Sequence, residues 1–160
     1  KEGPILLSEI STIEDFDQWI RLAREVEPLF GPMVEDPGFR EGLRRALADR
    51  NALCVRRTGC EAGRNIQGGI VVSPKDNEVL WFAVAEASRS QGVGKVLLDS
   101  AIQRLDPERP MIVTTFDRSV EAGLPARRLY RRHGFEDDRP GGLNPAGIPT
   151  VVMVRSNRTD

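Results

Sequence analysis

The stretch EVLWFAVAEASRSQGVGK, residues 78–95, is the part of the chain from which the fold is best predicted. Residues 79–85 are all aliphatic or aromatic, as expected of a buried strand. Gly92 and Gly94 then precede the run VLLDSAIQRL, which favours a helix that stops before Pro107. A glycine-rich turn between a strand and a helix presents free backbone N–H groups to a phosphate. The stretch therefore predicts an α/β fold with a phosphate-binding turn.

Strand and helix patterns continue on both sides of this turn. We expect strands at residues 5–10, 52–58, 65–72, 78–85, 111–116 and 150–154. We expect helices at residues 12–28, 37–49, from the glycine turn to 105, and 125–134. The order β-α-α-β-β-β-α-β-α-β is a mixed α/β arrangement (an α+β mixed sheet), which we place in one domain spanning 1–160. Residues 134–150 are predicted to be a long loop with at most a short strand at Phe135.

The composition excludes several classes of protein. Lys and Arg total 23 and Asp and Glu total 24, so the chain lacks the basic excess typical of proteins that bind nucleic acids or membrane surfaces. The first residues, KEGPILLSEI, lack the apolar core of a signal peptide. Cys54 and Cys60 are the two cysteines, and we expect them to be reduced thiols in a cytoplasmic protein, with a disulfide as the alternative. With one histidine they make no zinc site, so we expect no metal.

Two common phosphate-binding motifs do not fit the glycine turn. A Walker-type loop requires glycine where Arg89 stands and serine or threonine where Val96 stands. A dinucleotide fingerprint requires a third glycine where Leu97 stands. These departures argue against a protein that binds ATP or NAD.

A third pattern does fit. Arg89, Gly92 and Gly94 match a Gln/Arg-x-x-Gly-x-Gly/Ala motif, and the later stretch PARRLYRRHGF, residues 125–135, matches an alanine, tyrosine and Gly-Phe pattern. Both motifs resemble those of the GNAT superfamily of N-acetyltransferases, and the resemblance extends from residue 66 to residue 154. One position departs from the family, which often has asparagine where this chain has Gly123.

The resemblance implies a binding site for acetyl-CoA. The backbone amides of the turn would cradle the pyrophosphate, and the strand before the turn would pair through its main chain with the pantetheine arm. An N–H group of that strand would polarise the thioester carbonyl. The residues implied to bind acetyl-CoA are Phe82, Ala83, Val84, Arg89, Ser90, Gln91, Gly92, Val93, Gly94 and Lys95. For Lys95 a solvated side chain paired with Asp99 is the alternative.

The resemblance also implies how protons move. Tyr130 matches the general acid of the family, with a structural tyrosine in the core as the alternative. Glu78 begins the central strand, where some members carry an acidic base, with a surface charge as the alternative. Water is a further candidate for the base. Glu35 and Asp36 lie where the family binds its acceptor, although Asp36 is equally well explained as a helix cap.

The remaining basic residues of the second motif are interpreted structurally. His133 is expected to interact with the C-terminal end of its helix. The four arginines around Tyr130 are expected to form a mostly solvated face, from which one or two reach the nucleotide phosphates. They are Arg127, Arg128, Arg131 and Arg132.

The sequence therefore predicts an N-acetyltransferase that transfers an acetyl group directly from acetyl-CoA to a small-molecule or peptide amine. The acceptor is left open because it depends on the segment 28–50, which matches no motif. A sensor or interaction module that binds acyl-CoA without turnover is the alternative. Homodimers are common in the family, but no residue pattern here indicates a dimer interface.

Overall fold

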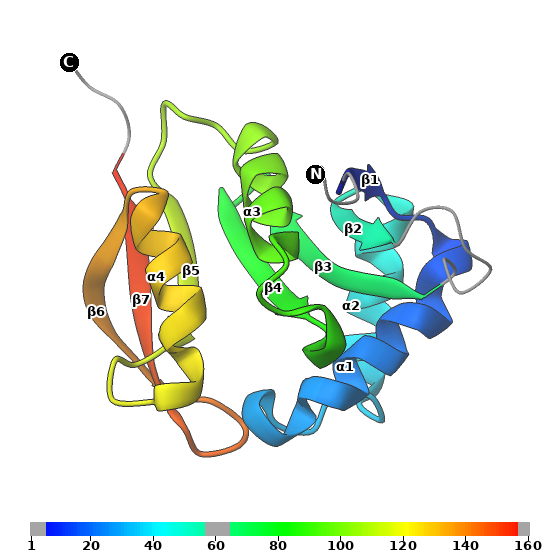
Figure 1. Cartoon of the computed structure of the whole chain (residues 1–160), viewed down its shortest axis with the longest axis horizontal. Coiled ribbons are helices and arrows are strands. Elements are labelled where there is room, and N and C mark those ends of the chain that lie inside the picture. The colour runs from blue at the N-terminus through cyan, green and yellow to red at the C-terminus, as the bar shows by residue number, and fades with distance from the viewer. Residues whose placement is uncertain (1–5, 57–64, 157–160) are drawn as a thin grey trace.

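The computed structural model describes residues 6–56 and 65–156, which form one seven-stranded sheet with the strand order β1-β2-β3-β4-β5-β7-β6 (Figure 1). The strands are β1 Ser8–Ile10, β2 Ala52–Arg56, β3 Ile66–Ser73, β4 Glu78–Val84, β5 Met111–Phe116, β6 Phe135–Leu143 and β7 Pro149–Arg155. The helices are α1 Phe16–Phe30, α2 Pro37–Ala48, α3 Val93–Gln103 and α4 Leu124–Arg132. Short 3-10 turns precede or connect them: η1 Ile13–Asp15, η3 Glu86–Ser88 and η4 Glu121–Gly123. The mixed α/β class predicted from the sequence is confirmed.

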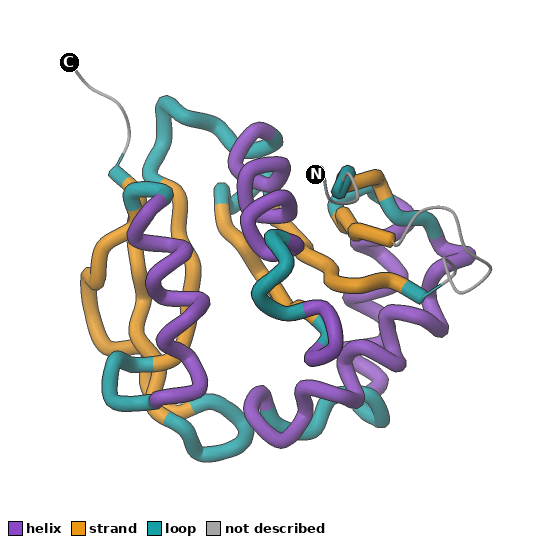
Figure 2. Tube along the Cα trace, viewed as in Figure 1, coloured by secondary structure: helices purple, strands orange, loops and turns teal. Residues whose placement is uncertain are grey.

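Two apolar cores lie on opposite faces of the sheet. One contains α3 and α4 side chains such as Leu97 and Tyr130, and the other contains α1 and α2 side chains such as Trp19 and Leu47 (Figure 2). Strand β3 contributes to both cores, because successive residues of a strand point to opposite faces. The sheet is thus covered on both sides, and the edges of its central strands are the places left for a ligand.

The centre of the sheet opens between β4 and β5. These two parallel strands are paired only at Glu78 with Ile112 and at Val79 with Val113. Beyond Val79 they separate, and Figure 1 shows β4 and β5 diverging between α3 and α4. The separation leaves one edge of β4 free of a neighbouring strand.

The predicted long loop at 134–150 is wrong for most of its length. Residues 135–143 form β6, which pairs antiparallel with β7 and leaves only 144–148 as the connection. The strand was missed because β6 is an edge strand whose side chains after Phe135 are exposed, so it shows no apolar alternation. Its register shifts near Asp137 and Pro140, and edge strands and bulges tolerate proline and glycine.

The first helix also differs from the prediction. It was expected to stop at Pro28, but α1 continues to Phe30 with Pro28 in its last turn. Proline lacks an N–H donor, but the last turn is retained because the Gly31 N–H donates to Glu27 O (2.8 Å). Leu29 and Phe30 are therefore helical and hold fixed positions beside the sheet.

Other expectations fall partly outside the described residues. Cys60 lies outside them, and so does the question of a disulfide. Cys54 is a buried free thiol, and burial raises its pKa to about 11. The expected strands 5–10 and 52–58 also extend beyond the described ranges. Within those ranges no helix is both long and apolar enough to span a bilayer.

Candidate active site

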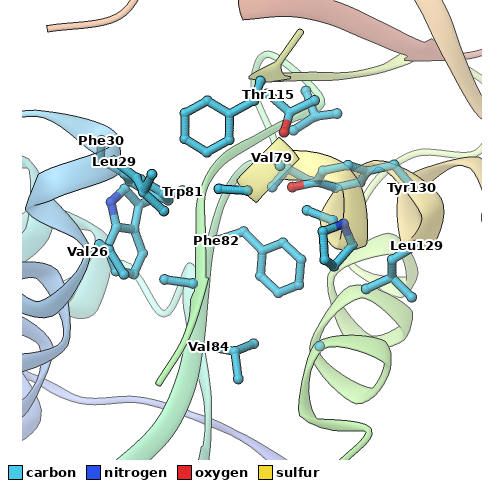
Figure 3. Close-up of a pocket in the computed structure, with 18 of the residues that line it drawn as sticks. Val26, Leu29, Phe30, Val79, Trp81, Phe82, Val84, Thr115, Leu129 and Tyr130 are labelled. Atoms are coloured by element: carbon cyan, nitrogen blue, oxygen red, sulfur yellow. The ribbon is translucent and has the colours of Figure 1, made fainter. Parts of the chain in front are cut away.

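A large cavity lies where β4 and β5 separate. It has a volume of about 940 Å³ and is lined by the end of α1, by β4 and β5, by the glycine turn and the start of α3, and by α4 (Figure 3). Sequence segments from Val26 to Thr150 contribute to its walls. A cavity of this size suits a ligand as large as a cofactor.

The free edge of β4 offers main-chain groups to this cavity. The Ala85 N–H donates to Gln67 O of β3 (2.8 Å), and hydrogen-bonding direction alternates along an antiparallel strand. Ala83 therefore also faces β3, while the backbone groups of Phe82 and Val84 face the opening. Consistent with this, the Val84 carbonyl accepts a hydrogen bond from Nε of Arg89 (3.3 Å) rather than from β3.

The glycine turn places an uncapped helix start at one end of the cavity. Gly92 adopts φ +90° and Ser90 adopts φ +64°, so the chain curls back just before α3. The first intrahelical bond of α3 runs from Val96 N–H to Gly92 O (3.1 Å), and no side chain caps the first turn. The amides that precede this bond therefore point outward, and together with the helix dipole they favour an anion.

Nearly all residues predicted to bind acetyl-CoA border the cavity. They are Phe82, Ala83, Val84, Arg89, Ser90, Gly92, Val93, Gly94 and Lys95. Gln91 does not line it, because its side chain turns back to donate to Ala87 O (3.2 Å). Lys95 pairs with Asp99 (2.9 Å), as the alternative expected, and it also lines the cavity, so its contact with a cofactor stays a prediction.

Tyr130 occupies the wall opposite β4. It is 3% exposed and packs edge-on against Phe82 and Phe135, with ring centroids 5.9 and 5.7 Å away. No described residue hydrogen-bonds its hydroxyl, which points into the pocket in Figure 3. Burial raises the pKa of Tyr130 far above its usual value, so the phenol stays protonated at neutral pH. A protonated hydroxyl without a protein partner is a proton donor available to a ligand.

Glu78, the predicted base, lies at the start of β4 and outside the cavity lining. Burial first, and the Asp76 carboxylate second, raise the pKa of Glu78. The lining itself contains a different carboxylate, Glu121 of η4, which the sequence reasoning did not select. Glu35 and Asp36 are not among the lining residues; Asp36 caps α2 through Gly38 and Phe39 N–H (both 3.3 Å).

The basic residues of α4 divide into different roles. Arg127 is 4% exposed and pairs with Asp137 of β6 (3.0 Å), so the expectation of a solvated side chain is wrong there. Arg132, the last residue of α4, is exposed and lines the cavity. His133 joins α4 to α3, with Nδ1 2.8 Å from Leu129 O and Nε2 2.6 Å from Asp99 Oδ1. The predicted helix-end role of His133 agrees with this geometry.

The departure at Gly123 has a steric explanation. Gly123 is buried, and a Cβ atom added there would lie 2.5 Å from Cβ of Phe116. No side chain fits beside Phe116 without a backbone shift. Phe116 of β5 therefore occupies the space that a side chain at position 123 would need.

The sequence reasoning missed an aromatic wall at the far end of the cavity. Phe30 of α1 lies edge-on between Trp81 of β4 and Phe116 of β5, with ring centroids 5.9 Å from each. All three line the cavity. The three rings are far apart in the sequence, so no local pattern predicts that they meet. The adjacent pair Trp81 and Phe82 in one strand was the only local indication of an aromatic surface.

A family comparison agrees with the geometry. The family model described as "Acetyltransferase (GNAT) domain" matches residues 49–137, more than half of the chain. No curated protein matches the chain by sequence. The family match includes β4, the glycine turn and α4, and it stops before most of β6 and all of β7.

Solved structures show the same fold at low sequence identity. Diaminobutyrate acetyltransferase EctA from Paenibacillus lautus, in complex with L-2,4-diaminobutyric acid and coenzyme A, is 16% identical, with a TM-score of 0.73 over 99% of both chains. NAA60 from Arabidopsis thaliana, in complex with a bisubstrate analogue, is 13% identical, with a TM-score of 0.72 over 96% of this chain and 100% of that chain. Ard1 from Thermoplasma volcanium is 20% identical, with a TM-score of 0.70 over 96% and 99%.

Proposed function

This chain belongs to the GNAT family of acetyltransferases, and we propose that it transfers an acetyl group from acetyl-CoA to a primary amine. The observation that carries the proposal is the meeting of three features in one cavity. They are the unpaired edge of β4, the uncapped start of α3 and the buried hydroxyl of Tyr130. Each suits a different part of an acyl-CoA and of its reaction.

Along the cavity, the three features match successive parts of acetyl-CoA. The amides at the start of α3, with Arg89 and Lys95 beside them, hold the pyrophosphate. The backbone groups of Phe82 and Val84 pair with the pantetheine amides as a neighbouring strand would. The thioester then lies past Phe82, within reach of Tyr130, whose ring packs against Phe82.

The chemistry is a direct displacement. The neutral amine nitrogen attacks the thioester carbonyl carbon, the carbon–sulfur bond breaks, and the thiolate sulfur takes a proton from Tyr130. A β4 N–H donates to the carbonyl oxygen as negative charge develops there. The Tyr130 phenolate regains its proton from solvent, and the amine nitrogen releases one to a base or to water.

Two carboxylates are candidates for that base. Burial, and then the Asp76 carboxylate, raise the pKa of Glu78, which makes its carboxylate a stronger base. Val79 and Leu80, which follow Glu78 in β4, line the cavity. Glu121 lies in the lining itself. We retain Glu78 as the proposed base, with water carrying the proton from the amine nitrogen to its carboxylate. Glu121 is the residue with which Glu78 is compared in the test of the base.

Calorimetric titration with acetyl-CoA, with ATP and NADH as controls, tests the binding half of the proposal. We expect acetyl-CoA alone to bind and to raise the melting temperature. Thiol release across a panel of amines tests the transfer half. Binding without thiol release from any amine would favour the non-catalytic sensor, and the absence of binding would contradict both functions.

A further inference from the structure

The end of the cavity away from the glycine turn is built from aromatic rings. Phe30, Trp81 and Phe116 come from α1, β4 and β5 and are each only partly buried, so their faces remain accessible from the cavity. Figure 3 shows Val26, Leu29, Phe30 and Trp81 on the side toward which the Tyr130 hydroxyl points. A group that reacts beside Tyr130 therefore extends toward an apolar, aromatic surface.

Two segments that are distant in the sequence are in contact beside this aromatic end. The Asn144 side chain, in the β6–β7 connection, donates from Nδ2 to Leu29 O at the end of α1 (2.9 Å). Gly31 packs so closely on the same connection that a Cβ atom there would lie 2.6 Å from Cβ of Pro145. Figure 1 shows this connection beside the end of α1. Leu29 and Asn144, which this contact joins, both line the cavity.

The charges of the cavity do not suit a polycationic acceptor. Of its described lining residues, three are basic and one is acidic: Arg89, Lys95, Arg132 and Glu121. An acceptor with several ammonium groups would find a single carboxylate, Glu121, among the described lining residues. Burying an unpaired charge beside apolar rings is costly.

We propose that the acceptor is a small primary amine that carries an aromatic ring, which packs among Phe30, Trp81 and Phe116 while the amine nitrogen faces Tyr130. This inference rests on the proposed acetyltransferase function and names the substrate class of the same site. Aromatic rings prefer the edge-on and offset arrangements that these three side chains already adopt with one another. An apolar surrounding also favours the neutral form of an amine, which is the form that attacks the thioester.

The first experiment compares acceptors with the unaltered protein. Thiol release from acetyl-CoA is measured with phenethylamine, tryptamine, butylamine, putrescine and a lysine-containing peptide. We expect kcat/KM for the two aromatic amines to exceed that for butylamine and putrescine by roughly tenfold or more. A preference for putrescine or the peptide would overturn the inference while leaving acetyl transfer intact. Release with none of them, although acetyl-CoA binds, would instead contradict the proposed function.

The second experiment alters the aromatic wall. Phe30→Leu and Phe116→Leu are compared with Phe39→Leu, in which an equally half-buried ring outside the cavity is removed. We expect the first two variants to raise KM for phenethylamine roughly tenfold, to leave KM for butylamine within about twofold and to leave acetyl-CoA affinity unchanged. Phe39→Leu should change none of these. Equal losses for phenethylamine and butylamine would show that the rings are structural only.

Tryptophan fluorescence supplies a readout that does not require turnover. Trp81 lines the cavity, and its ring lies 5.8 Å from that of Trp19. We expect titration with phenethylamine in the presence of desulfo-CoA, which has no thioester to react, to change the emission, and butylamine to leave it unchanged. An identical response to both amines would contradict the aromatic subsite.

Discussion

The two ends of the cavity are built in opposite ways. At the end where we propose that acetyl-CoA binds, referred to as the cofactor end, backbone groups of β4 and of the α3 start, within residues 82–95, border the cavity. At the acceptor end, the surface consists of side chains from α1, β4 and β5 that meet only in the folded chain. The comparison explains why the cofactor end shows a motif in the sequence whereas the acceptor end shows none.

The difference also predicts how each end responds to substitution. A site of main-chain groups tolerates most side-chain changes and is disrupted mainly where the backbone conformation or the space around it changes. A site of side chains is altered by any change of their size or polarity. Tyr130 lies between the two ends, because its ring packs on Phe82 and its hydroxyl points into the cavity.

The largest effect is expected at this junction. Tyr130→Phe removes the proposed proton donor and keeps the ring contacts with Phe82 and Phe135. We expect kcat to fall on the order of 100-fold or more, with the dissociation constant of acetyl-CoA changed less than about twofold. Single-turnover thiol release and calorimetry measure the two quantities. Unchanged turnover would remove Tyr130 from the mechanism.

The next largest effect should come from the backbone of the cofactor end. Gly92→Val forces a β-branched residue into φ +90° and displaces the amides of the turn. We expect acetyl-CoA affinity to fall by roughly 10- to 100-fold. Gly42→Val, at a helical position with open space around it, is the matched control and should bind normally. Equal affinity in both variants would show that the turn does not hold the pyrophosphate.

A substitution at Gly123 tests how tightly η4 packs against β5. Gly123→Ala brings a Cβ atom to 2.5 Å from Cβ of Phe116, so the backbone must shift. We expect a loss of about 1–3 kcal/mol in the free energy of unfolding, measured by urea denaturation. Gly38→Ala adds a Cβ atom at an ordinary contact distance of 3.5 Å and should leave stability nearly unchanged. No loss at Gly123 would mean that Phe116 moves freely.

The identity of the base is tested by pH dependence. Burial and Asp76 raise the pKa of Glu78, and a base acts in its deprotonated form. The value of kcat/KM should therefore rise as pH increases through that raised pKa. Glu78→Gln should abolish this rise and lower kcat/KM about tenfold, whereas Glu121→Gln should retain it. The reverse result would assign the base to Glu121.

The smallest effect concerns the link between the two helices of the cofactor end. Hydrogen bonds from Lys95 and then His133 lower the pKa of Asp99. A lowered pKa stabilises the fold above the usual aspartate pKa, and this contribution is lost as pH falls through the lowered value. Because the Asp99 side chain is 41% exposed, we expect Asp99→Asn to cost less than about 1 kcal/mol at pH 7.

The difference between Asp99→Asn and the unaltered protein should vanish in acid. Thermal unfolding at several pH values measures it, with Glu136→Gln on the exposed part of β6 as a neutral control. A difference that persists at a pH below the lowered pKa of Asp99 would show that Asp99 acts through packing rather than through its charge.

Much of the fold was predictable because its signals are local. The apolar run of β4, the proline and aspartate at the start of α2, and the glycine turn before α3 each occupy a few neighbouring residues. Strand β6 was missed for the opposite reason. Its only partner is β7, and its exposed residues follow no alternation, so pairing rather than composition makes it a strand.

The candidate site divides in the same way. Its cofactor end could be predicted from the sequence, because a glycine turn and a helix start expose their amides wherever they occur. The folded chain alone placed Tyr130 against Phe82, buried Arg127, put Phe116 in the space beside Gly123 and brought Phe30 to Trp81. These are contacts between side chains far apart in the sequence, and their geometry depends on how the two halves of the sheet separate between β4 and β5.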